Sequence, residues 1–319
     1  MDTELHNPPT AEEILQAAAR IRPYVNRTPV ITSSSLNRIT GAELFFKCEN
    51  FQKVGAFKAR GATNAVFALE ESMTGNGVAT HSSGNHAQAL SWAASLRNLP
   101  AYVVMPDNSS PVKINAVRGY GGNITFCKPT LEAREETLRD VIAATGAIEI
   151  HPYDNLHIIA GQATAAAELL EDYPDLDYLL VPVGGGGLLS GTALSTHYFS
   201  PRTRVIAAEP EQANDAWQSF TQRKFVPALH PDTMADGLRT SLGNYTFPII
   251  LHHVNNIVTV SEESIARAMR LVWERMKILI ETSSAVPVAA LTEGKMDVKG
   301  KQVGIILSGG NVDLDHLPW

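Results

Sequence analysis

The sequence predicts an α/β fold in which open, mostly parallel sheets are covered by helices. Strand-like runs alternate with helical patterns along all 319 residues, and no internal repeat or low-complexity segment interrupts the alternation. Such alternation favours parallel sheets with helices on their faces. The length accommodates two lobes. A content of 44% hydrophobic and 18% charged residues supports a sizeable packed core.

Short runs rich in β-branched and other apolar residues, bounded by polar or glycine-containing segments, predict the strands. In chain order these runs cover residues 44–47, 78–80, 101–105, 123–126, 148–151, 178–183, 204–208, 257–260 and 303–307. In open parallel sheets, ligands bind in the loops that follow the carboxyl ends of strands. Functional residues are therefore expected in those loops.

Apolar residues at helical spacing, together with capping signals, predict the helices. Thr10 and Glu13 match a capping box, which begins a helix that runs through Arg22. A second helix is predicted over residues 131–145, and a third, with a continuous apolar face, over residues 262–280. Helices of this kind are expected to cover the sheets.

The charge and the cysteine content exclude several classes of protein. The net charge of −7 argues against nucleic acid or an anionic membrane as the main partner. Cys48 and Cys127 are isolated, so they predict neither a disulfide framework nor a zinc site. The N-terminus lacks the basic-then-apolar order of a signal peptide, and no apolar run is long enough to span a bilayer. We therefore expect a cytoplasmic protein.

Four successive glycines follow the predicted strand 178–183 and precede a helical pattern. They are Gly184, Gly185, Gly186 and Gly187. Glycine lets backbone N–H groups turn toward one point, and a helix N-terminus adds partial positive charge. The spacing matches neither a P-loop nor a dinucleotide fingerprint. The segment therefore predicts a cup for a single phosphate group; the alternative is a flexible turn.

Two further loops are rich in hydroxyl and amide groups. The segment His-Ser-Ser-Gly-Asn-His at residues 81–86 lies between a predicted strand and a helix over 87–96, which suits a carboxylate or a ring oxygen. The alternative is an ordinary polar N-cap. The segment Ser-Gly-Gly-Asn at residues 308–311 follows the strand 303–307 and places a hydroxyl where it could face a ligand. The alternative there is a plain turn.

Lys58 lies immediately before a predicted helix over residues 59–69. A lysine at the positive end of a helix, beside Arg60, has a destabilised ammonium form. The neutral amine is the form that condenses with a carbonyl to give an imine. Lys58 is thus a candidate Schiff-base lysine, although a solvated surface lysine is the alternative.

These four motifs, in this order, resemble the β-family (fold-type II) of pyridoxal-phosphate (PLP) enzymes. The resemblance covers nearly the whole chain and is closest to the branch of serine racemase and the serine/threonine and 3-hydroxyaspartate dehydratases. The motifs of that branch are at residues 207–210, 235–237, 271–277 and 307–314. The resemblance implies two open, twisted, mostly parallel sheets, as in the tryptophan synthase β subunit. It also implies a large PLP-binding domain (1–76 and 155–319) and a small mobile domain (77–154).

The resemblance also implies roles for individual residues. Lys58 would form the Schiff base with PLP, the four glycines and Leu188 would bind its phosphate, Asn85 would bond the ring oxygen, Phe57 would pack beside the ring, and Ser308 would face the pyridine nitrogen. The substrate carboxylate would be held by Ser82, Ser83, Gly84, Asn85 and His86. Arg134 matches an arginine near the substrate entrance and would hold a second carboxylate, unless it is an exposed helical arginine. Glu209, Ala213 and Asp215 match a Mg²⁺ site that also suits Ca²⁺ or Mn²⁺.

The function implied is a PLP-dependent ammonia-lyase (dehydratase) that removes the β-hydroxyl of 3-hydroxyaspartate, serine or threonine. Lys58 would act as the base on one face of the substrate Cα. Ser83 matches the serine that serves the opposite face in racemases, so a serine racemase with dehydratase side activity is the first alternative. A non-catalytic ligand-binding protein is the second. The partners expected are a small amino-acid substrate and a second copy of the chain in a homodimer.

Overall fold

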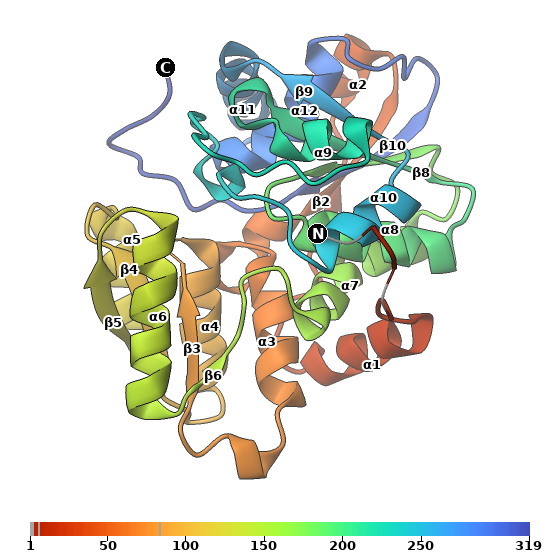
Figure 1. Cartoon of the computed structure of the whole chain (residues 1–319). Coiled ribbons are helices and arrows are strands. Elements are labelled where there is room, and N and C mark those ends of the chain that lie inside the picture. Colours follow the sequence, from red (N-terminus) through yellow and green to blue (C-terminus); the bar gives the residue numbers. More distant parts are fainter. Residues whose placement is uncertain (1–2, 6, 83) are drawn as a thin grey trace.

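The computed structural model describes residues 3–5, 7–82 and 84–319, which form two sheets with helices on their faces (Figure 1). The α/β class and the two mostly parallel sheets predicted from the sequence are confirmed. Within the described residues, no helix combines the length and the apolar character needed to cross a membrane.

The larger sheet has six strands in the order β1-β2-β10-β7-β8-β9. Only β1 and β2 pair in antiparallel fashion; the other neighbours are parallel. The strands are β1 (Val30–Ile31), β2 (Glu43–Cys48), β7 (Tyr178–Pro182), β8 (Arg204–Pro210), β9 (Asn256–Val260) and β10 (Gln302–Leu307). Strand β10 therefore lies in the interior of the sheet, between β2 and β7.

The smaller sheet has four parallel strands in the order β5-β4-β3-β6. The strands are β3 (Val78–His81), β4 (Ala101–Pro106), β5 (Gly122–Cys127) and β6 (Ile148–Glu149). We call this sheet with its helices, residues 78–149, the small unit, and the rest of the described chain the large unit.

Helices cover both faces of each sheet. In chain order they are α1 (Ala11–Ile21), α2 (Ser34–Thr40), α3 (Lys58–Ala68), α4 (Asn85–Ser95), α5 (Pro111–Gly119), α6 (Leu131–Thr145), α7 (Leu156–Asp172), α8 (Gly187–Phe199), α9 (Asp215–Gln222), α10 (Thr246–His253), α11 (Glu262–Met276) and α12 (Thr282–Thr292). Short 3₁₀ turns are η1 (Glu49–Phe51), η2 (Lys53–Gly55), η3 (Glu71–Met73), η4 (Glu211–Ala213) and η5 (Asp236–Leu238). In the small unit, α4 and α5 pack on one face and α6 on the other.

Alternate residues of the large sheet belong to two separate hydrophobic cores. Leu180 packs with Ala285 of α12 on one face, and its neighbour Leu179 packs with Leu189 of α8 on the other. Side chains of a strand alternate between the two faces of its sheet, and parallel strands covered on both sides are apolar throughout. The near-continuous apolar runs in the sequence therefore reflect a sheet buried on both faces.

The structure confirms most predicted elements and corrects some boundaries. The capping box of α1 is present, since the Thr10 hydroxyl accepts a hydrogen bond from Glu13 N and Glu13 Oε2 accepts one from Thr10 N. The helix predicted over 262–280 was too long: α11 ends at Met276 because Lys277 adopts a left-handed conformation with φ 60°. The strand predicted over 148–151 is also shorter, and β1 was not predicted because it has only two residues.

Candidate active site

Lys58, the glycine loop, Asn85 and Ser308 lie where the carboxyl ends of β3, β7 and β10 meet the start of α3. Lys58 is the first residue of α3 and is half-buried. Its Nζ donates a hydrogen bond to the carbonyl of Pro152 at 2.7 Å and lies 5.1 Å from the centre of the Phe57 ring. Burial lowers the pKa of Lys58 to about 8, against a raising effect of Glu281. Lys58 thus has an appreciable neutral fraction at mildly alkaline pH.

The predicted influence of Arg60 on Lys58 was wrong. The guanidinium of Arg60 is fully buried and contacts the carboxylates of Glu49 and Glu168. Side chains two residues apart on a helix project about 200° apart, so Arg60 points to the side of α3 away from Lys58. Loss of hydration, rather than a neighbouring cation, weakens the ammonium form of Lys58.

The glycine loop connects β7 to α8, and every residue in it is buried. In the described part of the chain, the N–H groups of residues 184–188 donate no hydrogen bond to a protein acceptor. A Cβ at Gly184 would lie 2.8 Å from Leu238 Cα, and one at Gly185 would lie 2.4 Å from the Tyr153 ring. Gly186 has φ 88°, a conformation that favours glycine. Unpaired donors at the start of a 13-residue helix form a site for an anion.

Ser308 lies beside the first turn of α3. The backbone N–H of Phe57 donates to the Ser308 carbonyl at 2.9 Å, and Ala56 forms a β-bridge with Gly309. The Ser308 hydroxyl is buried, 3.1 Å from the hydroxyl of Ser284. The predicted hydroxyl after β10 is therefore held next to the segment that carries Lys58.

Asn85, the first residue of α4, reaches across to the large unit. Its amide Nδ2 donates to Glu281 Oε1 at 2.9 Å, and its Oδ1 accepts from Asn311 Nδ2 at 2.8 Å. Burial, with the charge of Asp236, raises the pKa of Glu281 to about 7. These contacts bring the loop after β3 together with the loop after β10.

The remaining residues of the 81–86 segment occupy different environments. Ser83 lies outside the described residues. The Ser82 hydroxyl accepts a hydrogen bond from Gly84 N at 3.4 Å. The buried His86 ring contacts the carbonyl of Ile150 at 3.1 Å, and burial keeps its pKa well below the usual value. A contact of His86 with a substrate carboxylate would therefore come from its backbone N–H at the start of α4.

Three residues that follow β6 line the site but were not selected from the sequence: His151, Pro152 and Tyr153. The His151 ring packs edge-on against Tyr153 with ring centres 4.6 Å apart. Pro152 provides the carbonyl that accepts from Lys58. Ligands bind in the loops that follow the carboxyl ends of parallel strands, and this segment follows β6, so the same expectation applies to it. Glu281 was not selected from the sequence as a site residue either.

Arg134 lies on α6 and is half-buried. Its Nε donates to the Thr130 carbonyl at 3.3 Å. Burial and the neighbouring His151 lower the pKa of His81 to about 4, and the positive charge of Arg134 contributes to the shift. Arg134 is therefore close enough to the site to affect a residue at the end of β3.

A pair of buried carboxylates lies beyond the carboxyl end of β8. Glu209 accepts hydrogen bonds from the N–H groups of Ala216 and Trp217 at 2.9 and 2.7 Å. Both carboxylate oxygens of Asp215 are buried without a hydrogen-bond partner. Burial raises the pKa of Asp215 to about 7, and burial together with Asp215 raises that of Glu209 well above the usual value. Two buried acids without a cation fit a site for a hard divalent ion.

Ala213 lies between these acids, in η4. Among the described residues, no group of three or more histidine, cysteine, aspartate or glutamate side chains could hold a metal. A metal at this position would therefore need a backbone carbonyl, such as that of Ala213, in addition to the two carboxylates.

Comparison with known proteins supplies the family. Residues 21–309 match the family described as pyridoxal-phosphate dependent enzyme. The chain is a member of this family. It is 51% identical to the beta-hydroxyaspartate dehydratase of Paracoccus denitrificans, covering 98% of this chain and 99% of that protein. It is 47% identical to the L-threo-3-hydroxyaspartate ammonia-lyase of Saccharomyces cerevisiae, over 96% and 94% of the two chains.

The structure of this PLP-family member is similar to solved structures over nearly its whole length. The serine racemase of Dictyostelium discoideum has a TM-score of 0.91 and 49% identity, covering 96% of this chain and 99% of that chain. A threonine deaminase structure has a TM-score of 0.91 and 41% identity. The resemblance inferred from the sequence motifs is thereby confirmed at the level of family and fold.

Proposed function

We propose that this PLP-family enzyme is an ammonia-lyase that removes the β-hydroxyl of 3-hydroxyaspartate. The observation that carries the proposal is the position of Lys58, whose low-pKa amine lies where the glycine-loop, Asn85 and Ser308 segments meet. The substrate is proposed from two relatives, at 51% and 47% identity, whose names specify hydroxyaspartate.

The residues present fit the cofactor of the family. Residues 184–188 offer unpaired N–H groups for the cofactor phosphate. Lys58 offers an amine for the Schiff base, and the Phe57 ring lies beside that amine, where it would pack against the cofactor ring. Asn85 would bond the ring oxygen, and Ser308 would meet the ring nitrogen. When bound, PLP supplies an electron sink that makes the substrate Cα–H acidic and allows the β-hydroxyl to leave.

The chain itself orients the substrate and moves protons. The N–H groups at the start of α4 and the hydroxyl of Ser82, with Ser83, would hold the α-carboxylate. Lys58 would take the proton from Cα, and its lowered pKa favours the neutral amine that this role requires. The products would be a 2-oxo acid and ammonia.

Arg134 would hold the second carboxylate of 3-hydroxyaspartate. Its positive charge contributes to the lowered pKa of His81 at the end of β3, and a fork of donors matches a carboxylate in geometry and charge. Serine and threonine lack this group. The position of Arg134 thus favours the dicarboxylic substrate.

Glu209, Asp215 and the carbonyl of Ala213 would bind Mg²⁺, Ca²⁺ or Mn²⁺. The unpartnered carboxylate of Asp215 supports this assignment, because a buried anion needs a positive partner. The cation would stabilise the connection between β8 and α9, at the edge of the site. We further propose that residues 77–154 form a small mobile domain, and that the enzyme is a cytoplasmic homodimer.

Serine racemisation is the second candidate function. It is favoured by the 49% identity to the Dictyostelium serine racemase and by the presence of a serine at position 83. A racemase needs an acid–base group on each face of Cα, and Lys58 alone serves one face.

The deciding experiment incubates the purified protein with 3-hydroxyaspartate isomers, L-serine and L-threonine, then measures ammonia, 2-oxo acid and chirality. Ammonia released fastest from hydroxyaspartate supports the proposal; D-serine that accumulates faster than pyruvate, with hydroxyaspartate inert, contradicts it. Lys58→Ala should abolish both the visible absorbance band and activity, whereas Lys224→Ala, an exposed lysine, should change neither. A colourless protein that gains no band with added PLP would indicate a non-catalytic binding protein.

A further inference from the structure

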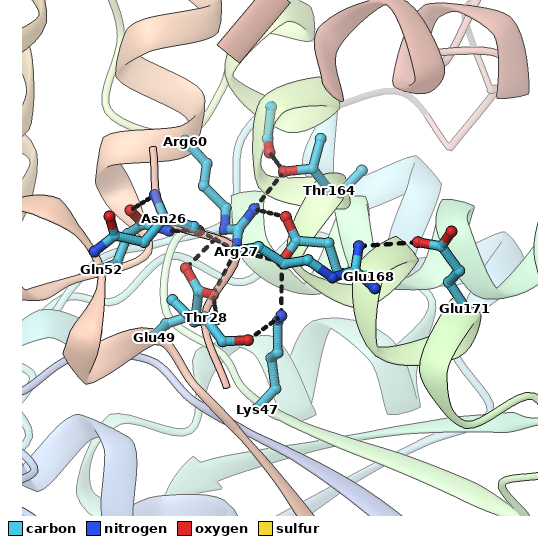
Figure 2. Close-up of polar contacts among 12 residues, drawn as sticks. Asn26, Arg27, Thr28, Lys47, Glu49, Gln52, Arg60, Thr164, Glu168 and Glu171 are labelled. Atoms are coloured by element: carbon cyan, nitrogen blue, oxygen red, sulfur yellow. Dashed lines mark hydrogen bonds and ion pairs between the residues drawn. The ribbon is translucent and has the colours of Figure 1, made fainter. Parts of the chain in front are cut away.

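The side chain of Arg60 is fully buried two residues after Lys58. Figure 2 shows its guanidinium between two carboxylates. Arg60 Nε and one terminal nitrogen each lie 2.8 Å from a Glu49 oxygen, and its two terminal nitrogens lie 2.7 and 2.8 Å from the two oxygens of Glu168. The hydroxyl of Thr164 provides a further acceptor at 3.2 Å. Arg60 is therefore held in two bidentate contacts.

Lys47 completes the charge balance of this cluster. Its Nζ lies 2.6 Å from a Glu168 oxygen and 2.8 Å from the Thr28 carbonyl, and the Thr28 hydroxyl donates to Glu49 at 2.5 Å. Two cations thus face two carboxylates. Burial alone would lower the pKa of Arg60, but Glu49 and Glu168 outweigh it, so the guanidinium stays charged. Loss of one member would leave a buried charge without its partner.

The partners of Arg60 all belong to the large unit. Glu49 lies in η1, directly after β2, and Glu168 and Thr164 lie on α7. Helix α7 packs closely on α8, since a Cβ at Gly191 would lie 2.6 Å from Ala163 N. Helix α8 begins at the glycine loop. The first turn of α3 is therefore fixed to the same body that carries the phosphate cup.

Helix α3 also packs against α4 of the small unit, and polar contacts to that unit lie at its C-terminal end. Arg97, just after α4, donates to the carbonyls of Val66 and Leu69 at 2.6 and 3.1 Å, and its guanidinium lies 5.7 Å from the centre of the Phe67 ring. Helix α3, which belongs to the large unit, thus also contacts the small unit and has a buried or half-buried arginine contact at each end.

We propose that Arg60 is a positioning residue, which fixes the first turn of α3, and with it Lys58, relative to the glycine loop. This inference rests on the proposed role of Lys58 as the cofactor lysine. Arg60 touches neither cofactor nor substrate; it acts through the backbone of the first turn of α3.

Arg60→Met and Arg97→Met form a matched pair, because each removes an arginine that holds one end of the same helix. Two readouts use the cofactor-stripped full-length protein: the rate at which added PLP develops the Schiff-base absorbance, and the rate at which an amine-reactive reagent modifies Lys58, measured by mass spectrometry relative to Lys224. We expect Arg60→Met to slow the rate of PLP capture at least tenfold and to change the rate of Lys58 modification at least threefold. Arg97→Met should leave both rates within twofold of wild type, even where it lowers Tm as much.

Milder variants keep the test valid if Arg60→Met does not fold. Thr164→Val removes one contact to Arg60 and should slow capture two- to fivefold, and Arg60→Lys, which retains charge but only a single donor group, should capture PLP at a rate between Arg60→Met and wild type. In Arg97→Met, the change in PLP-capture rate can be compared with the change in Tm. The inference is overturned if every Arg60 and Thr164 variant loses capture rate only in the same proportion to its loss of Tm. Failure of wild type to capture PLP through Lys58 would instead contradict the proposed function, so the two failures are distinguishable.

Discussion

Asn85 and Glu281 are hydrogen bonded between the small and the large unit, with Asn85 Nδ2 2.9 Å from Glu281 Oε1 and 3.1 Å from Oε2. Glu281 is 5% exposed, and burial raises its pKa to about 7. A neutral amide donor therefore faces a carboxyl group that changes charge near physiological pH.

Glu281→Gln should change how the stability of the cofactor-free protein depends on pH. A raised pKa means that the folded state binds a proton more tightly than the unfolded chain. The contribution of Glu281 to the free energy of unfolding is therefore fully present below pH 4.5 and is lost as pH rises toward about 7. At about 1.4 kcal/mol per pKa unit the loss is up to about 3 kcal/mol. Urea unfolding at pH 5 to 8 should show a flatter profile for Glu281→Gln. Glu263→Gln, an exposed control on α11, should keep the wild-type profile.

Asp215→Asn should abolish stabilisation by Mg²⁺. The raised pKa of Asp215, about 7, means that metal-free protein loses stability as pH rises toward that value, whereas a bound cation favours the carboxylate. The increase in Tm on adding Mg²⁺ should therefore grow between pH 6 and 8 in wild type and vanish in Asp215→Asn. Glu211→Gln, an exposed acid in η4, should respond as wild type. An unchanged Mg²⁺ effect in Asp215→Asn would show that the cation binds elsewhere.

Gly185→Ala should destabilise the protein and weaken PLP binding. The added methyl group would lie 2.4 Å from the Tyr153 ring, so the ring or the loop must shift, at a cost of about 1–3 kcal/mol. Tyr153→Ala in the same chain should restore Tm but not PLP affinity, because the methyl group still narrows the phosphate cup. Gly119→Ala, where a Cβ meets no atom within 4 Å, is the control for the substitution itself. Wild-type PLP affinity in Gly185→Ala would exclude the loop as the phosphate site.

Arg134→Met should lower kcat/KM for hydroxyaspartate much more than kcat/KM for L-serine. Loss of a charged hydrogen bond of about 1.5–3 kcal/mol corresponds to a decrease of roughly 10- to 100-fold in kcat/KM for the dicarboxylic substrate. The value for L-serine should stay within threefold. Arg139→Met, on the exposed face of α6, should affect neither. Equal losses for the two substrates would mean that Arg134 supports the small unit rather than recognising a second carboxylate.

The strands and the ligand loops could be predicted from local sequence because their signals are local. Residues 184–187 lie between an apolar strand and a helix, a pattern that needs no tertiary information. Strand order is different: β2 lies beside β10, whose residues are far away in sequence, and no local pattern specifies that pairing. The arrangement of the strands in two sheets was predicted from the family resemblance, not from local patterns.

The missed or misread residues have long-range partners. Glu281 meets the amide of Asn85, 196 residues away, and no pattern around Glu281 in the sequence points to that partner. Arg60 was predicted to act on Lys58 because the two are close in sequence, but their helical spacing directs them to opposite sides of α3. Its actual partner Glu168 is 108 residues away. Lys277 ends α11 through a left-handed backbone conformation that lysine rarely adopts, so the apolar pattern over-extended that helix.

The interior position of β10 determines when the large sheet can form during synthesis. Strands β1 and β2 pair with each other, but their connection to β7, β8 and β9 passes through β10. Those N-terminal strands must therefore wait, with one edge unpaired, until residues 302–307 leave the ribosome. The small sheet, whose strands all lie within residues 78–149, can close much earlier. A nascent chain stopped just before β10 would carry a finished small unit and two disconnected parts of the large sheet, each with an exposed edge open to aggregation.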